Sequence, residues 1–141
     1  MPTIEDAILL ATQAHRGQRD RGGAPYIYHP LRLMLAVETE AERFVAILHD
    51  VVEDSDLSLE DLRAHGYDEA IVEAVDCLTR REGEPYQAMI ERIKNNPLAR
   101  RVKLADLADN MDLRRQGLVN IADLDRLRHY QQAWAALTRE A

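Results

Sequence analysis

Apolar residues recur every three or four positions along most of this chain, and no segment alternates convincingly between apolar and polar residues. Recurrence at that spacing is typical of one face of an α-helix, whereas a half-buried strand alternates with a period of two. The pattern therefore predicts an all-α fold. We expect helices near residues 4–16, 30–38, 40–53, 58–65, 68–79, 84–95, 96–115 and 120–137.

Capping residues mark most of the predicted helix starts, because their side chains accept hydrogen bonds from the first free backbone N–H groups. The predicted caps are Thr3 with Asp6, Thr39 with Glu42, Ser58 with Asp61, Asn96 before Pro97, and Asn120. Between the first two helices, the segment RGQRDRGGAPYIYHP holds three glycines and two prolines, which favours a loop. No repeat, linker or low-complexity segment interrupts the chain, so we expect a single domain over residues 1–141.

Composition and charge narrow the classes of protein to which the chain can belong. A net charge of −7 and an isoelectric point near 5.2 argue against a broad nucleic-acid-binding surface, which needs many Lys and Arg residues. Cys77 is the only cysteine, which favours a reducing compartment. The start of the chain carries acids where a signal peptide would carry basic residues, and no apolar run reaches the length of a membrane span. We expect a cytoplasmic protein with neither nucleic-acid nor membrane partners.

The stretch AILHDVVED, residues 46–54, places four ionisable side chains inside one of the most apolar parts of the chain. In a continuous helix, His49, Asp50, Glu53 and Asp54 lie on one side, because positions three and four apart are neighbours. Burying an unpaired carboxylate is costly, and a bound metal ion offsets that cost. An isolated His-Asp pair is more often a capped or salt-bridged edge of a helix, so this stretch alone does not establish a metal site.

Two further segments carry polar residues that can join the same centre. His29 stands directly before Pro30, which disfavours helical geometry at His29 and can itself begin a helix. In VKLADLADNMD, Lys103, Asp106 and Asn110 follow one another at three- and four-residue intervals and form a polar stripe. The stripe can face a shared polar centre.

Three segments together resemble the HD-domain metal-dependent phosphohydrolases: HRGQRDRGGAPYIYHPLRLM, AILHDVVEDSDLSLEDL and RRVKLADLADNMD. More narrowly, they resemble the stand-alone hydrolases of the RelA/SpoT family, which remove the 3′-pyrophosphate from guanosine tetra- and pentaphosphate. The resemblance runs from about Ala14 to Leu113, with the segments in the same order and at similar spacing. It implies an HD-type helical bundle. Since no synthetase or regulatory domain follows in the sequence, we expect only hydrolase chemistry.

By position, the resemblance implies metal ligands at His29, His49, Asp50 and Asp106. Two imidazoles and two carboxylates form a mixed nitrogen and oxygen set, which suits Mn²⁺ or another divalent ion better than a closed thiolate zinc site. The cofactor that we expect is therefore a divalent metal ion, with Mn²⁺ as the first choice.

The resemblance also implies residues that act on the water and on the substrate. Glu53 and Asp54 match the family's acidic pair, which can take a proton from a metal-bound water or orient that water; their roles can be exchanged. Arg19, Arg21 and Lys103 are the cations that we expect to hold phosphates, with Asn110 bonding the substrate or a ligand. Tyr86 and Arg92 can reach the pocket, although their spacing does not establish this.

Two positions depart from the family pattern. Asp109 stands where a histidine or an aromatic residue often precedes the asparagine, and Asp20 stands where many long members have an arginine. We expect both changes to affect contacts with the base and ribose more than the metal chemistry. The expected partner is a small-molecule nucleotide. The alternatives are a phosphatase or nucleotidase for another phosphorylated metabolite, and a nucleotide-binding regulatory module without turnover. The sequence does not predict the oligomeric state.

Overall fold

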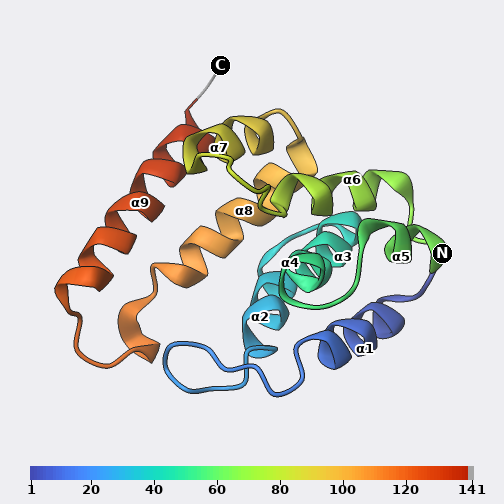
Figure 1. Ribbon diagram of the computed structural model, residues 1–141, viewed down its shortest axis with the longest axis horizontal. Helices are drawn as coiled ribbons and strands as arrows, with labels where there is room; N and C mark the ends of the chain where they lie inside the picture. Colours follow the sequence, from blue (N-terminus) through green and yellow to red (C-terminus); the bar gives the residue numbers. More distant parts are fainter. Residues whose placement is uncertain (140–141) are drawn as a thin grey trace.

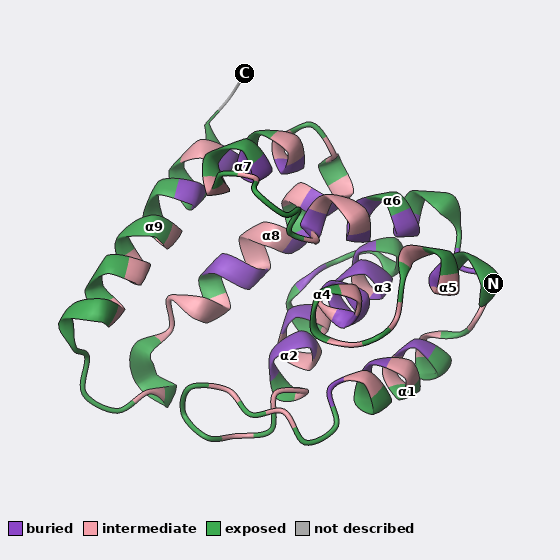
Figure 2. Cartoon of the chain, in the orientation of Figure 1, coloured by how far each residue is buried: buried purple, intermediate pink, exposed green. Residues whose placement is uncertain are grey.

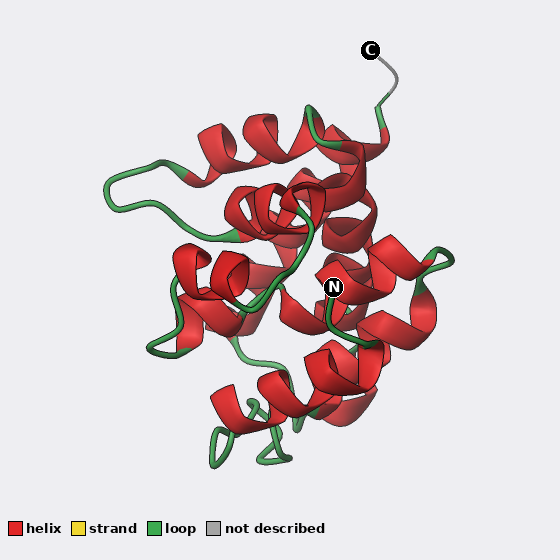
Figure 3. Ribbon diagram, turned by 90° about the vertical axis from the view of Figure 1, so that its right-hand side faces the viewer, coloured by secondary structure: helices red, strands yellow, loops and turns green. Residues whose placement is uncertain are grey.

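The computed structural model describes residues 1–139, and within them the chain forms nine α-helices, one short 3-10 helix and no β-strand (Figures 1 and 3). The elements are α1 (Ile4–Ala14), α2 (Tyr28–Ala36), α3 (Glu40–Leu48), α4 (Val51–Asp54), α5 (Leu59–Ala64), α6 (Glu69–Leu78), α7 (Tyr86–Lys94), α8 (Pro97–Asn110), η1 (Leu113–Arg115) and α9 (Ile121–Thr138). The predicted all-α fold is confirmed.

Helix α3 lies at the centre of the molecule and contacts α1, α2, α6 and α8. Every residue of α3 from Phe44 to Leu48 is buried, and Figure 2 shows buried segments gathered along α3 and the facing side of α8. A helix with so little exposed surface is expected to be surrounded by other helices. Because α3 is central, its apolar residues pack on the surrounding helices, and its C-terminal end brings His49 and Asp50 into the interior of the molecule.

The structure corrects the predicted helix over residues 40–53, because the chain leaves helical geometry between His49 and Asp50. Helix α3 ends at Leu48, and Asp50 adopts φ −109° and ψ 0° before α4 begins at Val51. This sparsely populated region of backbone space often holds active-site residues. The interruption changes the directions of the side chains that follow it, so the ionisable residues of this stretch do not form a simple helical stripe.

Most predicted caps are confirmed. Thr3, Ser58 and Asn120 each form reciprocal capping boxes, and Asn96 caps α8 ahead of Pro97. At α3, the Thr39 side chain accepts from the N–H of Glu42 at 3.1 Å. The carboxylate of Glu42, however, accepts from the N–H of Glu38, so the second half of the predicted box is displaced by one residue.

The predicted helix to about residue 115 is too long, since α8 ends at Asn110 and only the separate turn η1 follows. The chain then crosses to α9, which runs alongside α8 and returns towards α7 (Figure 1). The loop between α1 and α2 lies at the same end of the molecule as η1 (Figure 1). None of the helices within residues 1–139 combines the length and the apolar character that crossing a bilayer requires.

Candidate metal centre and substrate cavity

Three parts of the chain bring the predicted metal ligands together. His29 comes from the first turn of α2, His49 and Asp50 from the interruption between α3 and α4, and Asp106 from α8. One ligand atom from each of His29, His49 and Asp50 lies within 4.8 Å of the others. Oδ1 of Asp106 lies 2.8 Å from Nε2 of His29 and 3.8 Å from Nε2 of His49, so all four side chains border one small space.

His49 shows most clearly that these residues fit a metal ion. Its Nδ1 lies 2.7 Å from the carbonyl oxygen of Ala46, which can only accept, so Nδ1 carries the proton. Its Nε2 is buried and has no hydrogen-bond partner among the described residues, although Oδ2 of Asp50 lies 2.9 Å away. The approach to Asp50 is close but lacks hydrogen-bond geometry. A buried imidazole nitrogen without a hydrogen bond, beside two carboxylates, belongs to a donor set that suits a divalent cation once the nitrogen gives up its proton.

His29 lies between two carboxylates of α8. Its Nε2 is 2.8 Å from Oδ1 of Asp106, and its Nδ1 is 2.6 Å from Oδ2 of Asp109. Burial alone lowers the pKa of His29, but the bonds to Asp106 and Asp109 outweigh burial and raise the pKa to about 9. The imidazole is therefore doubly protonated at neutral pH unless a metal ion displaces the proton on Nε2.

Asp106 is a buried carboxylate, with only 7% of the residue exposed. Burial opposes its charge, but Lys103, with Nζ 3.0 Å from Oδ2, and the neighbouring histidines hold its pKa well below the usual value. Asn110 donates to Oδ1 at 3.1 Å. Lys103 and Asn110, which we expected to bind substrate, thus contact Asp106 directly.

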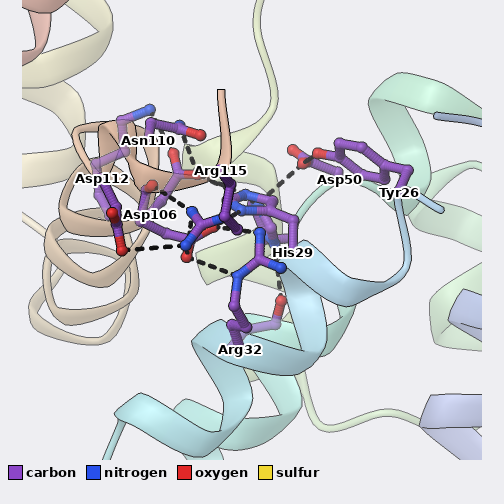
Figure 4. A network of polar contacts seen from close by, with 12 residues as sticks. Tyr26, His29, Arg32, Asp50, Asp106, Asn110, Asp112 and Arg115 are labelled. Carbon is purple, nitrogen blue, oxygen red and sulfur yellow. Dashed lines mark hydrogen bonds and ion pairs between the residues drawn. The ribbon is translucent and has the colours of Figure 1, made fainter. Parts of the chain in front are cut away.

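Asp50 has a further partner on the loop before α2. The hydroxyl of Tyr26 donates to its Oδ2 (Figure 4). Burial and the negative charge of Asp50 raise the pKa of Tyr26, so this hydroxyl keeps its proton and remains a donor. The same loop is fastened to α4 by Gln18, which donates to the carbonyl of Asp54 at 2.8 Å and also contacts Nδ1 of His15.

The structure differs from our expectation for Asp109. Its carboxylate contacts His29, Arg32 and Arg115 rather than remaining free for a base or ribose. Burial opposes the charge of Asp109, but His29 and Arg32 hold its pKa well below the usual value. Arg115 also pairs with Asp112 at 3.1 Å, which extends the network onto η1.

A cavity of about 780 Å³ opens beside the metal centre. It is lined by His29, His49, Asp50 and Asp106, together with Glu53, Arg19, Arg21, Lys103 and Asn110 from the predicted set. Asp54 does not line the cavity. Burial and the charge of Asp50 raise the pKa of Asp54, and His15, His49 and His29 partly oppose this rise. Asp54 therefore interacts electrostatically with residues of the centre, although it does not line the cavity.

Glu53 and Tyr86 lie on the side of the cavity formed by α4, α7 and the segment between α6 and α7. Oε1 of Glu53 accepts from the backbone N–H of Arg80 at 3.0 Å, while burial raises the pKa of Glu53. Tyr86 lines the cavity, as the sequence allowed. Arg92 does not: it pairs with Glu84 at 2.7 Å and donates to carbonyls at the end of α6, because the polypeptide between α6 and α7 folds back over it.

The sequence reasoning missed the contribution of α9. Arg126, His129 and Tyr130 line the cavity from this helix. Their spacing of three and four places them on one helical face, which was a signal in the sequence, but no motif connected that face with the centre. Arg32, Arg80 and Arg115 were missed because their contacts join separate parts of the fold.

The chain matches no protein-family model, but it is similar to several known proteins. Over 121 residues, 77% of this chain, it is 35% identical to a GTP pyrophosphokinase of Streptomyces coelicolor. Over 123 residues it is 30% identical to a guanosine-3′,5′-bis(diphosphate) 3′-pyrophosphohydrolase of Vibrio cholerae. The chain spans only 14% and 17% of the lengths of these two relatives.

The fold matches a solved structure, that of a metazoan SpoT ortholog that hydrolyses ppGpp, with a TM-score of 0.79 and 25% sequence identity. The match covers 98% of this chain and 88% of the other. The resemblance to the RelA/SpoT hydrolases is thus confirmed by both sequence and fold. The similarity to solved structure extends over almost the whole chain, whereas the curated relatives are several times longer.

Proposed function

We propose that this chain, a relative of the RelA/SpoT proteins, is a metal-dependent hydrolase that removes the 3′-pyrophosphate of guanosine tetra- or pentaphosphate. The observation that carries the proposal is the convergence of two histidines and two aspartates, with the buried Nε2 of His49 left without a hydrogen bond. This arrangement opens into a cavity with several cationic side chains, which fits an anionic substrate.

The curated relatives are named for two opposite activities, so their names alone do not choose between synthesis and hydrolysis. This chain carries the candidate metal centre and the acidic pair Glu53 and Asp54, which together suit the activation of water. The metazoan relative of similar size is described as hydrolysing ppGpp. These observations favour hydrolysis for this chain.

The proposed reaction adds one water to guanosine tetraphosphate. The water oxygen forms a bond to the phosphorus next to the ribose, the bond from that phosphorus to the 3′ oxygen breaks, and GDP and pyrophosphate leave. When bound, the divalent ion lowers the pKa of the water and balances charge on the phosphate. The chain's own residues must then remove one proton and position the phosphates.

Glu53 is the residue that we assign to the water. It lines the cavity, its carboxylate is held by the N–H of Arg80, and its raised pKa makes it a better proton acceptor than an ordinary exposed glutamate. We assign Asp54 a supporting role, since it lies outside the lining but next along the chain. Lys103 and Asn110 hold Asp106. Arg19 and Arg21 line the cavity, where their guanidinium groups can bind phosphate.

The remaining details are also proposals. Mn²⁺ suits the mixed nitrogen and oxygen donor set, and one HD unit spanning the chain is sufficient to build the site. The single cysteine, Cys77, is compatible with a reducing cytoplasm in which a nucleotide signal would be found.

A product assay tests the proposal. The purified chain is incubated with Mn²⁺ and, in separate reactions, with guanosine tetraphosphate, dNTPs, nucleoside monophosphates and a generic phosphodiester. We expect pyrophosphate release from guanosine tetraphosphate alone, and its loss in the Asp50→Ala variant. The Asp56→Ala variant changes an aspartate outside the cavity lining and serves as the matched control.

Each alternative outcome has a meaning. If the chain consumed only dNTPs or monophosphates, guanosine tetraphosphate would be the wrong substrate, while the assignment of the metal centre would stand. Equal activity of wild type and Asp50→Ala would refute the metal assignment. Binding of guanosine tetraphosphate by a Mn²⁺-loaded chain without turnover would favour a regulatory module.

A further inference from the structure

The two histidines of the candidate centre are anchored through the same ring atom by different groups. Nδ1 of His49 donates to the backbone carbonyl of Ala46 at 2.7 Å. Nδ1 of His29 lies 2.6 Å from the side chain of Asp109. In both rings Nε2 faces the space that Asp50 and Asp106 border, at 3.8 Å or less from Asp106. A backbone carbonyl therefore contacts Nδ1 of His49, and a side-chain carboxylate contacts Nδ1 of His29.

The carboxylate of Asp109 is fully occupied within the chain. Oδ1 accepts from Nε of Arg32 at 2.8 Å and from an amino group of Arg115 at 3.0 Å. Oδ2 accepts from Nη2 of Arg32 at 3.0 Å and from Nδ1 of His29. A carboxylate has about four acceptor positions, so these four contacts leave none for a substrate.

The two arginines fix Asp109 from opposite parts of the chain. Arg32 lies one turn after His29 on α2, and its contact with Asp109 joins α2 to α8. Arg115 lies on η1 and also donates to the backbone carbonyl of Asp109 at 2.8 Å. A bidentate arginine contact restricts the orientation of a carboxylate as well as its position. Asp109 is therefore held independently of His29.

We propose that Asp109 is a positioning residue that holds the His29 ring through Nδ1, so that Nε2 is directed at the metal ion. The proposal rests on the proposed metal centre but not on the identity of the substrate. Metal-ligating histidines generally donate their second ring N–H to a carboxylate or a carbonyl, and loss of that partner weakens metal binding. The aspartate at position 109 thus acts on the metal chemistry, in contrast to the base and ribose contacts expected from the sequence.

The test compares Mn²⁺ binding by the whole chain and two variants, with free Mn²⁺ measured by electron paramagnetic resonance. Asp109→Asn keeps the size and one acceptor but loses the carboxylate. Asp112→Asn is the matched control, because Asp112 pairs with Arg115 in the same network without contacting His29. We expect Asp109→Asn to weaken Mn²⁺ binding about 10- to 100-fold and Asp112→Asn to leave it unchanged. Equal affinities for the two variants would overturn the proposal.

A second measurement needs no substitution and remains decisive if Asp109→Asn fails to fold. Nuclear magnetic resonance of the ¹⁵N-histidine chain loaded with ¹¹³Cd²⁺ reports which ring nitrogen binds the metal. We expect cadmium coupling at Nε2 of both His29 and His49, with a retained proton on Nδ1 of His29. Coupling at Nδ1 of His29 would overturn the proposal.

These readouts separate the proposal from the proposed function. A chain that binds Mn²⁺ tightly in an Asp109-dependent way but leaves guanosine tetraphosphate intact would refute the substrate and keep the positioning role. If the wild-type chain is active, we expect the Asp109→Asn variant to recover most of that activity at saturating Mn²⁺. The interaction that this variant loses is with His29, a proposed metal ligand, and not with the substrate. Lost activity at every Mn²⁺ concentration would contradict this.

Discussion

At the scale of single residues, the candidate site is defined by polar atoms that the fold buries without satisfying. Burying an imidazole nitrogen or a hydroxyl without a partner is unfavourable, so such atoms are rare in native structures. Among the described residues, the side-chain atoms of this kind are Nε2 of His15, Nε2 of His49 and the hydroxyl of Tyr86. His49 and Tyr86 line one cavity. A ligand in that cavity can supply what each of them lacks.

The first prediction concerns Tyr86. Nζ of Lys103 lies 5.7 Å and Cζ of Arg80 6.0 Å from its ring centroid. Its buried hydroxyl has no hydrogen-bond partner among the described residues, so we expect it to donate to a bound phosphate. We expect Tyr86→Phe to lower kcat/KM about 10- to 100-fold, as for the loss of a bond to a charged group. The same substitution should not lower the free energy of unfolding, since it removes a buried unsatisfied group. Steady-state kinetics and urea unfolding measure the two effects.

Tyr28→Phe is the control for Tyr86→Phe. Tyr28 is half exposed and lies outside the cavity lining, so its hydroxyl should not contribute to turnover. If both variants kept the same kcat/KM as wild type, Tyr86 would have no role with the substrate.

The second prediction separates the acids from the metal ligands. Glu53→Gln removes the carboxylate that we assign to the water but none of the four ligands. We expect kcat to fall at least about 100-fold, the range for a lost general base, while Mn²⁺ affinity measured by calorimetry remains near that of wild type. If Glu53→Gln kept its turnover and Asp54→Asn lost it, Asp54 would be the residue that acts on the water and Glu53 the supporting one.

At the scale of the elements, the sequence predicted what local rules determine and missed what long-range contacts determine. The starts of α1, α5, α8 and α9 were predicted because a cap is a local interaction between residues a few positions apart. The break at Asp50 was not, since the apolar pattern continues through it. The break depends on contacts of His49 and Asp50 with other parts of the chain, which no local pattern records.

The third prediction concerns the contact between the α1–α2 loop and η1. A Cβ atom added at Gly22 would meet the carbonyl oxygen of Arg115 at 2.6 Å, so one backbone must move. This loop carries Arg19 and Arg21. We expect Gly22→Ala to raise KM and to lower the free energy of unfolding by about 1–3 kcal/mol, the usual cost of overpacking. Kinetics and urea unfolding test this.

Gly117→Ala is the matched control, because a Cβ at position 117 meets nothing within 4 Å and its backbone is not in the left-handed region. It should leave both quantities unchanged. An unchanged KM in Gly22→Ala would show that the loop contact does not shape the cavity.

At the scale of the whole molecule, the titration of the centre is coupled to folding. The pKa of His29 is about 9 in the folded, metal-free chain and about 6.5 when unfolded. The bound proton therefore stabilises the fold fully below pH 6.5, and this stabilisation is lost as the pH rises through 9. Metal binding requires the neutral ring, so the proton and the metal ion compete for Nε2.

The fourth prediction follows from this coupling. We expect the free energy of unfolding of the metal-free chain to fall by about 3 kcal/mol between pH 6.5 and 9, since each unit of pKa difference is worth about 1.4 kcal/mol. Mn²⁺ affinity should rise over the same interval. Urea unfolding and calorimetry at several pH values measure both. Stability that is constant or rises over this range would contradict the assignment of a doubly protonated His29 held by Asp106 and Asp109.

Much of the candidate site was also accessible from the sequence. His29, His49, Asp50 and Asp106 were assigned from the motifs, and the fold brings them to one place. The contacts of Asp109, on which its proposed role rests, could not be predicted from the sequence, because Arg32 and Arg115 approach it from α2 and η1. The cavity wall supplied by α9 depends on how that helix packs on α7 and α8.

The most direct test of the central claim is the identity of the products that the wild-type chain forms from guanosine tetraphosphate with Mn²⁺. Anion-exchange chromatography with ³¹P nuclear magnetic resonance separates the possibilities. We predict GDP and pyrophosphate in equal amounts, dependent on Mn²⁺ and absent in Asp50→Ala. Release of orthophosphate, cleavage on the 5′ side, or no reaction in a folded and Mn²⁺-loaded chain would contradict the account.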